Sequence, residues 1–291
     1  MNPFAFKVAI LIPDTANHYF ADLAQYVQRF VISANGLGVI FSSDGRRDVE
    51  LRHVGALASF GFDGIVFVSV GDNFRVYEEL VRLRLPHVVL DREVPESGWC
   101  DFVLSDNVLG SRLAAEHLIS LRHEAVAYLA GDQRTEPGRA RLEAFQQTFS
   151  KAGKALRDNA IVFGDFSFKC GYDFGKRLVE SSSEYSAIAC GNDLMAIGVL
   201  QALQESGVAI PAQVSVVGYD DIPCASWVYP RLTTVRQEVS ELARYAVDVL
   251  VFRIDQQRDA ASSSVNGWTP TLRPVPPRLI ARESCRPNQQ A

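Results

Sequence analysis

The amino-acid sequence predicts an α/β fold made of two doubly wound lobes, each built on a parallel sheet. Three observations lead to this prediction. Short apolar runs alternate with segments of helical spacing, this alternation occurs about five times and then about five times again, and 291 residues exceed one average domain. A closed β/α barrel is the structural rival, but about ten strand runs fit two five-stranded sheets better.

Each expected strand is a short run rich in Val, Ile and Phe, the pattern of a parallel strand buried on both faces. The first series comprises Val8–Ile12, Val39–Ser42, Gly64–Val68, His87–Leu90 and Phe102–Leu104. The second series comprises Ala125–Leu129, Ile161–Phe163, Ala187–Cys190, Val214–Val217 and Thr233–Val235. A last strand-like run, Leu279–Ile280, precedes the polar C-terminal residues.

The segments between the strands have the spacing of amphipathic helices, as in the first of them with Phe20, Leu23, Ala24 and Val27. Asn192 is expected to N-cap the helix DLMAIGVLQALQESG, which would end at Gly207 in a left-handed cap. A further helix is expected from roughly Glu238 to Ile254. The polar stretch DQQRDAASSSVNG and the Pro-rich TPTLRPVPPR that follow it predict loop.

The composition excludes several classes of protein. The 47% hydrophobic and 22% charged residues are typical of a globular chain. A net charge of −5, without any long Lys/Arg run, argues against direct contact with nucleic acid. No segment approaches the roughly 18 apolar residues of a membrane span, and the apolar stretch Val8–Pro13 is too short for a signal peptide. The 5 scattered cysteines fit neither a disulfide framework nor a metal motif, so we expect a cytoplasmic protein without membrane contact.

Polar and aromatic side chains follow nearly every expected strand, at the edge where open α/β sheets bind ligands. The candidate ligand-binding residues at this edge are Asn17, Tyr19, Phe20, Asp91, Arg92, Arg141, Phe166, Asn192, Asp220 and Gln237. Aromatic faces pack on the C–H side of a sugar ring, while carboxylates, guanidinium groups and amides pair with its hydroxyls. Taken singly, each Asp or Asn is better explained as a turn former or helix N-cap, and the others as core or surface residues. Their recurrence at one edge of both lobes favours a monosaccharide site.

Several stretches of the chain resemble the LacI/GalR family of bacterial transcription regulators, namely SDNVLGSRLAAEHLISLRH, GNDLMAIGVLQAL, VSVVGYDDIP, PRLTTVRQ and RLIARESC. The resemblance extends from Lys7 to Cys285 and is shared, more distantly, with periplasmic ribose-type binding proteins. It implies the periplasmic-binding-protein-like type I fold, whose two lobes are joined by three crossovers. We expect these near Ser105–Asp106, near Gln237 and in the loop before Leu279. The expected lobes are residues 1–105 plus 237–270 and residues 106–236 plus 271–285, with 286–291 as a tail.

Carried over by motif, the resemblance implies that both lobes line one sugar site. The N-terminal lobe would supply Asn17, Tyr19, Phe20, Asp91 and Arg92, and the C-terminal lobe Arg141, Phe166, Asn192 and Asp220, with Gln237 at the hinge. This set resembles the hydroxyl-binding residues of ribose-type receptors, so it favours a free monosaccharide, with a pentose as one candidate, over a purine. Phe20 and Phe166 would enclose the sugar ring. His18, Arg122 and Gly191 depart from the family pattern, and His18 lies nearest the ligand.

The resemblance also implies a function, the ligand-linked closure of two lobes in a transcriptional repressor that acts as a homodimer. Nothing ahead of Lys7 resembles a helix-turn-helix, so we expect either a truncated chain or a natural headless relative. Operator DNA would then be bound only through a headpiece that this chain lacks.

Two other classes of function remain open at the level of sequence. A transport receptor with the same fold is disfavoured by the missing signal peptide and by the RLIARESC ending. An enzyme is disfavoured because no GxGxxG follows a strand and no GxxxxGK[ST] or GxSxG motif occurs. We therefore expect neither catalytic residues nor a cofactor. His117 and His123 do not share a helix face, which argues against a metal site.

Overall fold

A computed structural model describes residues 4–71, 74–92, 100–154, 156, 158–181, 185–260 and 271–289. The chain forms two compact units, each with its own sheet. The first unit comprises Met1–Ser105 and Glu238–Val275, and the second comprises Asp106–Gln237 and Pro276–Ala291. The chain therefore passes three times from one unit to the other.

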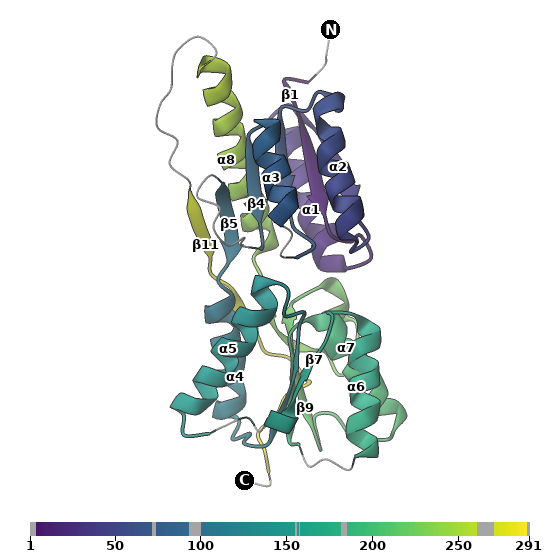
Figure 1. Ribbon diagram of the computed structural model, residues 1–291. Coiled ribbons are helices and arrows are strands. Elements are labelled where there is room, and N and C mark those ends of the chain that lie inside the picture. The colour runs from purple at the N-terminus through teal and green to yellow at the C-terminus, as the bar shows by residue number, and fades with distance from the viewer. Residues whose placement is uncertain are drawn as a thin grey trace. The chain divides into compact units, whose positions relative to one another are not determined.

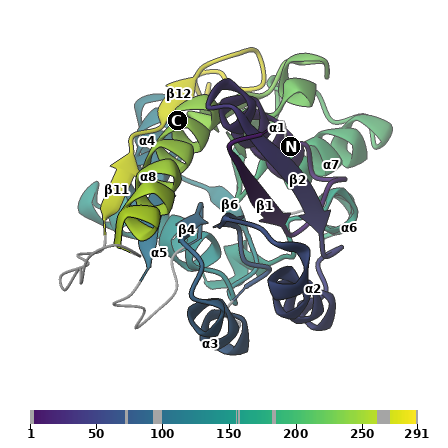
Figure 2. The ribbon, with the colours of Figure 1, turned by 90° about the horizontal axis from the view of Figure 1, so that it is seen from above.

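The first unit is a parallel sheet of six strands covered by helices on both faces (Figure 1). Its strands lie in the order β11 (Leu272–Val275), β5 (Asp101–Ser105), β4 (His87–Leu90), β3 (Gly64–Phe67), β1 (Phe6–Ile12) and β2 (Gly36–Ser42). Helices α2 (Arg47–Phe60) and α3 (Phe74–Leu83) pack on one face with a core around Leu57, Phe67 and Leu80. Helices α1 (His18–Ser33) and α8 (Val239–Ala260) contact one another and the sheet, and Figure 2 shows them opposite α2 and α3.

The second unit repeats this architecture. Its strands lie in the order β12 (Arg278–Ile280), β10 (Thr233–Arg236), β9 (Ser215–Asp220), β8 (Ala187–Cys190), β6 (Val126–Ala130) and β7 (Ile161–Phe163). Helices α4 (Asn107–Ser120) and α5 (Glu136–Lys151) pack on one face around Phe145 and Phe149. Helices α6 (Phe168–Glu180) and α7 (Asp193–Glu205) pack on the other face around Met195 and Leu200. Two short 3-10 helices, Asp158–Ala160 and Pro223–Ser226, complete the unit.

The doubly wound α/β prediction is confirmed, and all ten apolar runs of the two series contain a strand. Asn192 caps α7 through Met195 N at 3.0 Å, and Gly207 has a left-handed φ of 74°, as the sequence predicts. The expected count of five strands per sheet is wrong, because β11 and β12 each add an edge strand. The β12 strand pairs antiparallel with β10, so the second sheet is mixed.

The Pro-rich stretch predicted as loop contains β11, which pairs with Phe102–Ser105. Proline is tolerated there because an edge strand has one side without partners. The start of DQQRDAASSSVNG is also helical, since α8 continues to Ala260, whereas 261–270 lie outside the described residues. No helix among the described residues is long and apolar enough to cross a membrane.

The expected lobe boundaries need three changes. Gln237 belongs to the second unit, and residues 271–275 belong to the first because β11 pairs with β5. The expected tail is tied to the second unit, since Arg286 N donates to Ser215 Oγ at 3.2 Å and Asn288 N donates to Leu121 O at 2.8 Å.

Candidate functional site

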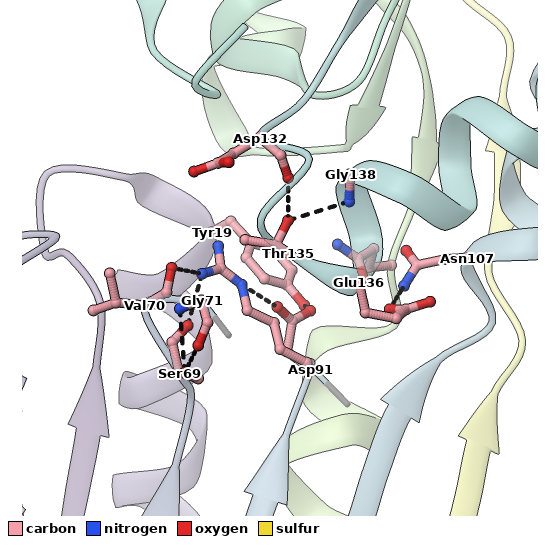
Figure 3. Close-up of polar contacts among 12 residues, drawn as sticks. Tyr19, Ser69, Val70, Gly71, Asp91, Asn107, Asp132, Thr135, Glu136 and Gly138 are labelled. Atoms are coloured by element: carbon pink, nitrogen blue, oxygen red, sulfur yellow. Dashed lines mark hydrogen bonds and ion pairs between the residues drawn. The ribbon is translucent and has the colours of Figure 1, made fainter. Parts of the chain in front are cut away.

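In the first unit, the candidate residues come from the segments that follow β1 and β4. Asn17 precedes α1 and caps it, because its side-chain oxygen accepts a hydrogen bond from Tyr19 N at 3.0 Å. The cap fixes the first turn, and the hydroxyl of Tyr19 donates to Asp91 Oδ1 at 2.5 Å (Figure 3). The structure thus brings together two predicted residues that are 72 positions apart in the chain.

Asp91 and Arg92 directly follow β4 and form a charged pair at its carboxyl end. Asp91 has a left-handed φ of 71°, and its Oδ2 lies 3.7 Å from Arg92 Nε. The Arg92 guanidinium donates through Nη1 to Ser69 O at 2.6 Å and to Val70 O at 2.9 Å. It also lies over the ring of Phe20, 5.0 Å from the ring centroid. Phe20 therefore supports the guanidinium group within this unit, and its expected contact with a sugar stays a prediction.

Glu50 is a buried carboxylate that the sequence argument missed. It lies on α2, is 2% exposed, and accepts a hydrogen bond from Val70 N at 2.7 Å. It thereby fixes the loop whose carbonyl groups hold Arg92. A glutamate on a polar helix carries no sequence signal for such a role, because its partner lies 20 residues away.

In the second unit, Arg141 is the centre of a buried polar network. Its Nε donates to Asn107 Oδ1 at 2.8 Å, and its Nη1 donates to Gly191 O at 2.8 Å. The same Nη1 lies 3.4 Å from Asp220 Oδ1, and the guanidinium carbon lies 3.7 Å from the centroid of the Tyr219 ring. Arg141 is only 4% exposed, so it is not a surface residue, which is one of the alternatives that the sequence leaves open.

The network continues from Asp220 to the end of the unit. Gln237 Nε2 donates to Asp220 Oδ1 at 2.8 Å, and Gln237 is the last residue before the chain enters the first unit. At the other end, Asn107 follows the first crossover by one residue. The hydrogen bonds and ion pair from Asn107 through Arg141 and Asp220 to Gln237 therefore connect the place where the polypeptide enters the second unit with the place where it returns to the first.

Asn107 and Glu136 are further members that the sequence argument missed. Asn107 Nδ2 donates to Glu136 Oε2 at 3.1 Å, as Figure 3 shows. The start of α5 is fixed by Thr135, whose side chain accepts from Gly138 N at 3.2 Å. Gly138 is required at this turn because a Cβ there would lie 2.1 Å from Asp132 O. This rigid turn sets the position of Arg141 on the same helix.

Asn192 and Phe166 form a separate contact in the second unit. Besides capping α7, Asn192 donates through Nδ2 to Phe166 O at 3.0 Å. Phe166 has a left-handed φ of 68°, and its ring lies against Gly131, where a Cβ would meet ring carbons at 2.0 Å. Both the oxygen and the nitrogen of the Asn192 amide are thus hydrogen-bonded to backbone atoms of the protein. A direct contact of Asn192 with sugar stays a prediction.

Asp193 is a further buried carboxyl group in the second unit, close enough to Asp220 to interact with its charge. Asp193 accepts hydrogen bonds from Thr234 Oγ1 at 2.6 Å and from Ile222 N at 2.9 Å. Burial raises the pKa of Asp193 well above its usual value, and the nearby Asp220 raises it further. The two donors oppose this shift, since they stabilise the charged form.

The geometry suits recognition of hydroxyl groups more than catalysis. In each unit the candidate guanidinium lies beside a carboxylate, Arg92 beside Asp91 in the first and Arg141 beside Asp220 in the second. Such pairs offer both donors and acceptors without a large net charge, which matches a neutral polyol. Among the residues that the structure describes, no group of three or more His, Cys, Asp or Glu side chains could hold a metal ion.

Comparison with known proteins places the chain in a family. The periplasmic binding protein-like domain family matches residues 115–285. The ribose operon repressor of Escherichia coli (strain K12) is 32% identical over 250 residues, which cover 86% of this chain and 76% of the repressor. The chain belongs to the LacI family of transcriptional regulators. The periplasmic-binding-protein-like fold expected for this LacI-family core is thereby confirmed.

Solved structures of other LacI-family regulators agree with this assignment. A regulator from Enterococcus faecalis V583 with bound ribose is 27% identical, with a TM-score of 0.83 over 97% of this chain and all (100%) of that chain. The regulator CelR in complex with cellobiose is 26% identical, with a TM-score of 0.86 over 97% of this chain and 85% of that one. The relatives and solved structures named here are described as repressors or transcription regulators.

Proposed function

We propose that this protein senses a neutral monosaccharide, and that sugar binding changes the affinity of the full-length regulator for operator DNA. The observation that carries the proposal is the buried chain of bonds from Asn107 through Arg141 and Asp220 to Gln237. Its polar atoms suit hydroxyl groups, and its two ends lie beside crossovers. The ribose named for several relatives supports a pentose as the first candidate.

The pairing of charges favours an unphosphorylated sugar. Arg92 and Arg141 are the cations of the candidate set, and each already faces a carboxylate. A phosphate group would bring its own negative charge next to Asp91 or Asp220, which costs free energy in a buried site. Hydroxyl groups donate to carboxylates and accept from guanidinium groups, so they fit both pairs.

The mechanism that follows is ligand-linked closure of the two units. A sugar that binds the closed arrangement more tightly than the open one stabilises it by that difference in affinity. A sugar bound at Arg141 would also act on Asn107 and Gln237, because both are hydrogen-bonded into the network that contains Arg141. A change at the crossovers alters the spacing of two DNA-binding headpieces, and half-site spacing is a geometric requirement of operator binding.

Homodimerisation is part of the same proposal. Trp227 is 72% exposed and Tyr229 is 84% exposed, both in the segment between β9 and β10. Large exposed aromatic side chains are enriched at protein interfaces, and a second copy of this chain is the partner that a two-headed regulator requires. Sedimentation velocity at micromolar concentration is expected to give a dimer, whereas a monomer at every concentration would contradict this part of the proposal.

A thermal-shift screen tests the proposed function. Pentoses, hexoses, sugar phosphates and nucleobases are each added to the purified chain, and the melting temperature is recorded. A ligand that binds the folded chain stabilises it by RT ln(1 + [L]/Kd), so the effector raises the melting temperature. A neutral sugar is expected to give the largest rise. A rise with nucleobases or sugar phosphates but not with neutral sugars would overturn the proposal, and turnover of a sugar would favour an enzyme.

A further inference from the structure

The contact between Tyr19 and Asp91 has a consequence for the choice of sugar. The phenol donates its single proton to Asp91 Oδ1 at 2.5 Å (Figure 3). Tyr19 is 4% exposed and Asp91 is 2% exposed, so water competes little for this bond. With its proton engaged, the phenol oxygen can only accept a hydrogen bond from a ligand.

The second oxygen of Asp91 is also partly engaged, since Oδ2 lies 3.7 Å from Arg92 Nε. An ionised carboxylate with both oxygens open can accept hydrogen bonds from two neighbouring hydroxyl groups of a sugar. In this protein, the hydroxyl of Tyr19 already holds one of those positions on Oδ1. The capacity of Asp91 for sugar hydroxyls is therefore reduced by one.

We propose that Tyr19 is a specificity-determining residue, whose hydroxyl takes the place of a sugar hydroxyl at Asp91. The preferred ligand is then a neutral sugar that lacks a hydroxyl at the carbon facing Asp91 Oδ1, which is a deoxy sugar. This inference rests on the proposed function, because it concerns the same sugar site.

The physical reason is a difference between two affinities. A hydroxyl at the carbon that faces Oδ1 must share that oxygen with the phenol proton, so its own bond to Oδ1 is weakened and replaces only part of the bond that it loses to water. A ligand with hydrogen at that carbon loses nothing there. Without the phenol hydroxyl, Asp91 Oδ1 regains the position that the phenol held, and a site built to bond a hydroxyl there rejects analogues that lack it.

The test compares the unaltered chain with Tyr19→Phe by isothermal titration calorimetry. The probes are D-ribose and its 2-deoxy, 3-deoxy and 5-deoxy analogues, or the same series of the hexose if the screen selects a hexose. The unaltered chain is expected to bind one deoxy analogue at least as tightly as its parent. In Tyr19→Phe, the preference for the parent over that analogue is expected to rise by about tenfold or more.

Two controls make the result specific. Tyr26→Phe removes a hydroxyl from the same helix outside the candidate set, and it should leave every affinity ratio unchanged. Asp91→Asn in the Tyr19→Phe background should erase the gained preference for the parent sugar, because the opened acceptor is altered. If Tyr19→Phe binds the parent sugar and every ratio stays as in the unaltered chain, the inference is wrong. If no neutral sugar binds the unaltered chain, it is the proposed function that fails.

Discussion

The two sets of site residues are held in different ways. In the first unit, Arg92 is held mainly by backbone carbonyl groups of one loop, and Asp91 accepts from the hydroxyl of Tyr19 and lies beside the Arg92 guanidinium. In the second unit, Arg141 is bonded to side chains on α4 and β9 and to the backbone of the segment between β8 and α7. The comparison indicates that the second unit presents a rigid, mutually dependent network, whereas the first presents contacts that can be altered one at a time.

The largest expected effect is that of Arg141→Ala. The change leaves Asp220 and Asn107 buried without their cationic partner, so the affinity for the sugar should fall by about 2–5 kcal/mol. Arg92→Ala in the first unit removes a guanidinium whose partners are mostly carbonyl groups, and it should cost about 1–3 kcal/mol. Calorimetry with the sugar identified by the screen measures both values.

The comparison between the two units predicts that Arg141→Ala loses more sugar affinity than Arg92→Ala. An Arg92→Ala variant that loses more affinity than Arg141→Ala would reverse the comparison between the units. Arg139→Ala, on the same helix as Arg141 but outside the candidate set, is the matched control and should keep the sugar affinity within about threefold.

The sequence predicts the fold well because each buried parallel strand is a separate apolar run. It fails for β11, since this edge strand contains Arg273 and Pro274 and lacks the apolar pattern of a buried strand. The candidate site is predicted where a residue lies at the carboxyl end of a strand, as Asp91 does directly after β4 and Asp220 does as the last residue of β9. Asn107 was missed because its bond to Arg141 spans 34 residues, and no local pattern shows a contact of that kind.

The smallest expected effects come from the two helix caps, Asn17 in the first unit and Asn192 in the second. Each caps a helix through one hydrogen bond of 3.0 Å, to Tyr19 N and to Met195 N, and the loss of such a cap costs about 0.5–2 kcal/mol. Asn192 also donates to Phe166 O at 3.0 Å, a bond worth about 1 kcal/mol. Asn192→Ala should therefore lower the free energy of unfolding more than Asn17→Ala does.

Aspartate substitutions separate the cap from the second bond. Asp keeps the acceptor that caps the helix but lacks the amide proton, so Asn17→Asp should unfold like the unaltered chain in a urea titration without sugar. Asn192→Asp should lose about 1 kcal/mol, the contribution of the bond to Phe166 O. If Asn192→Asp is instead as stable as the unaltered chain, the left-handed backbone of Phe166 is held by the contact of its ring with Gly131 alone. The second unit would then be less mutually dependent at this corner than the network around Arg141 indicates.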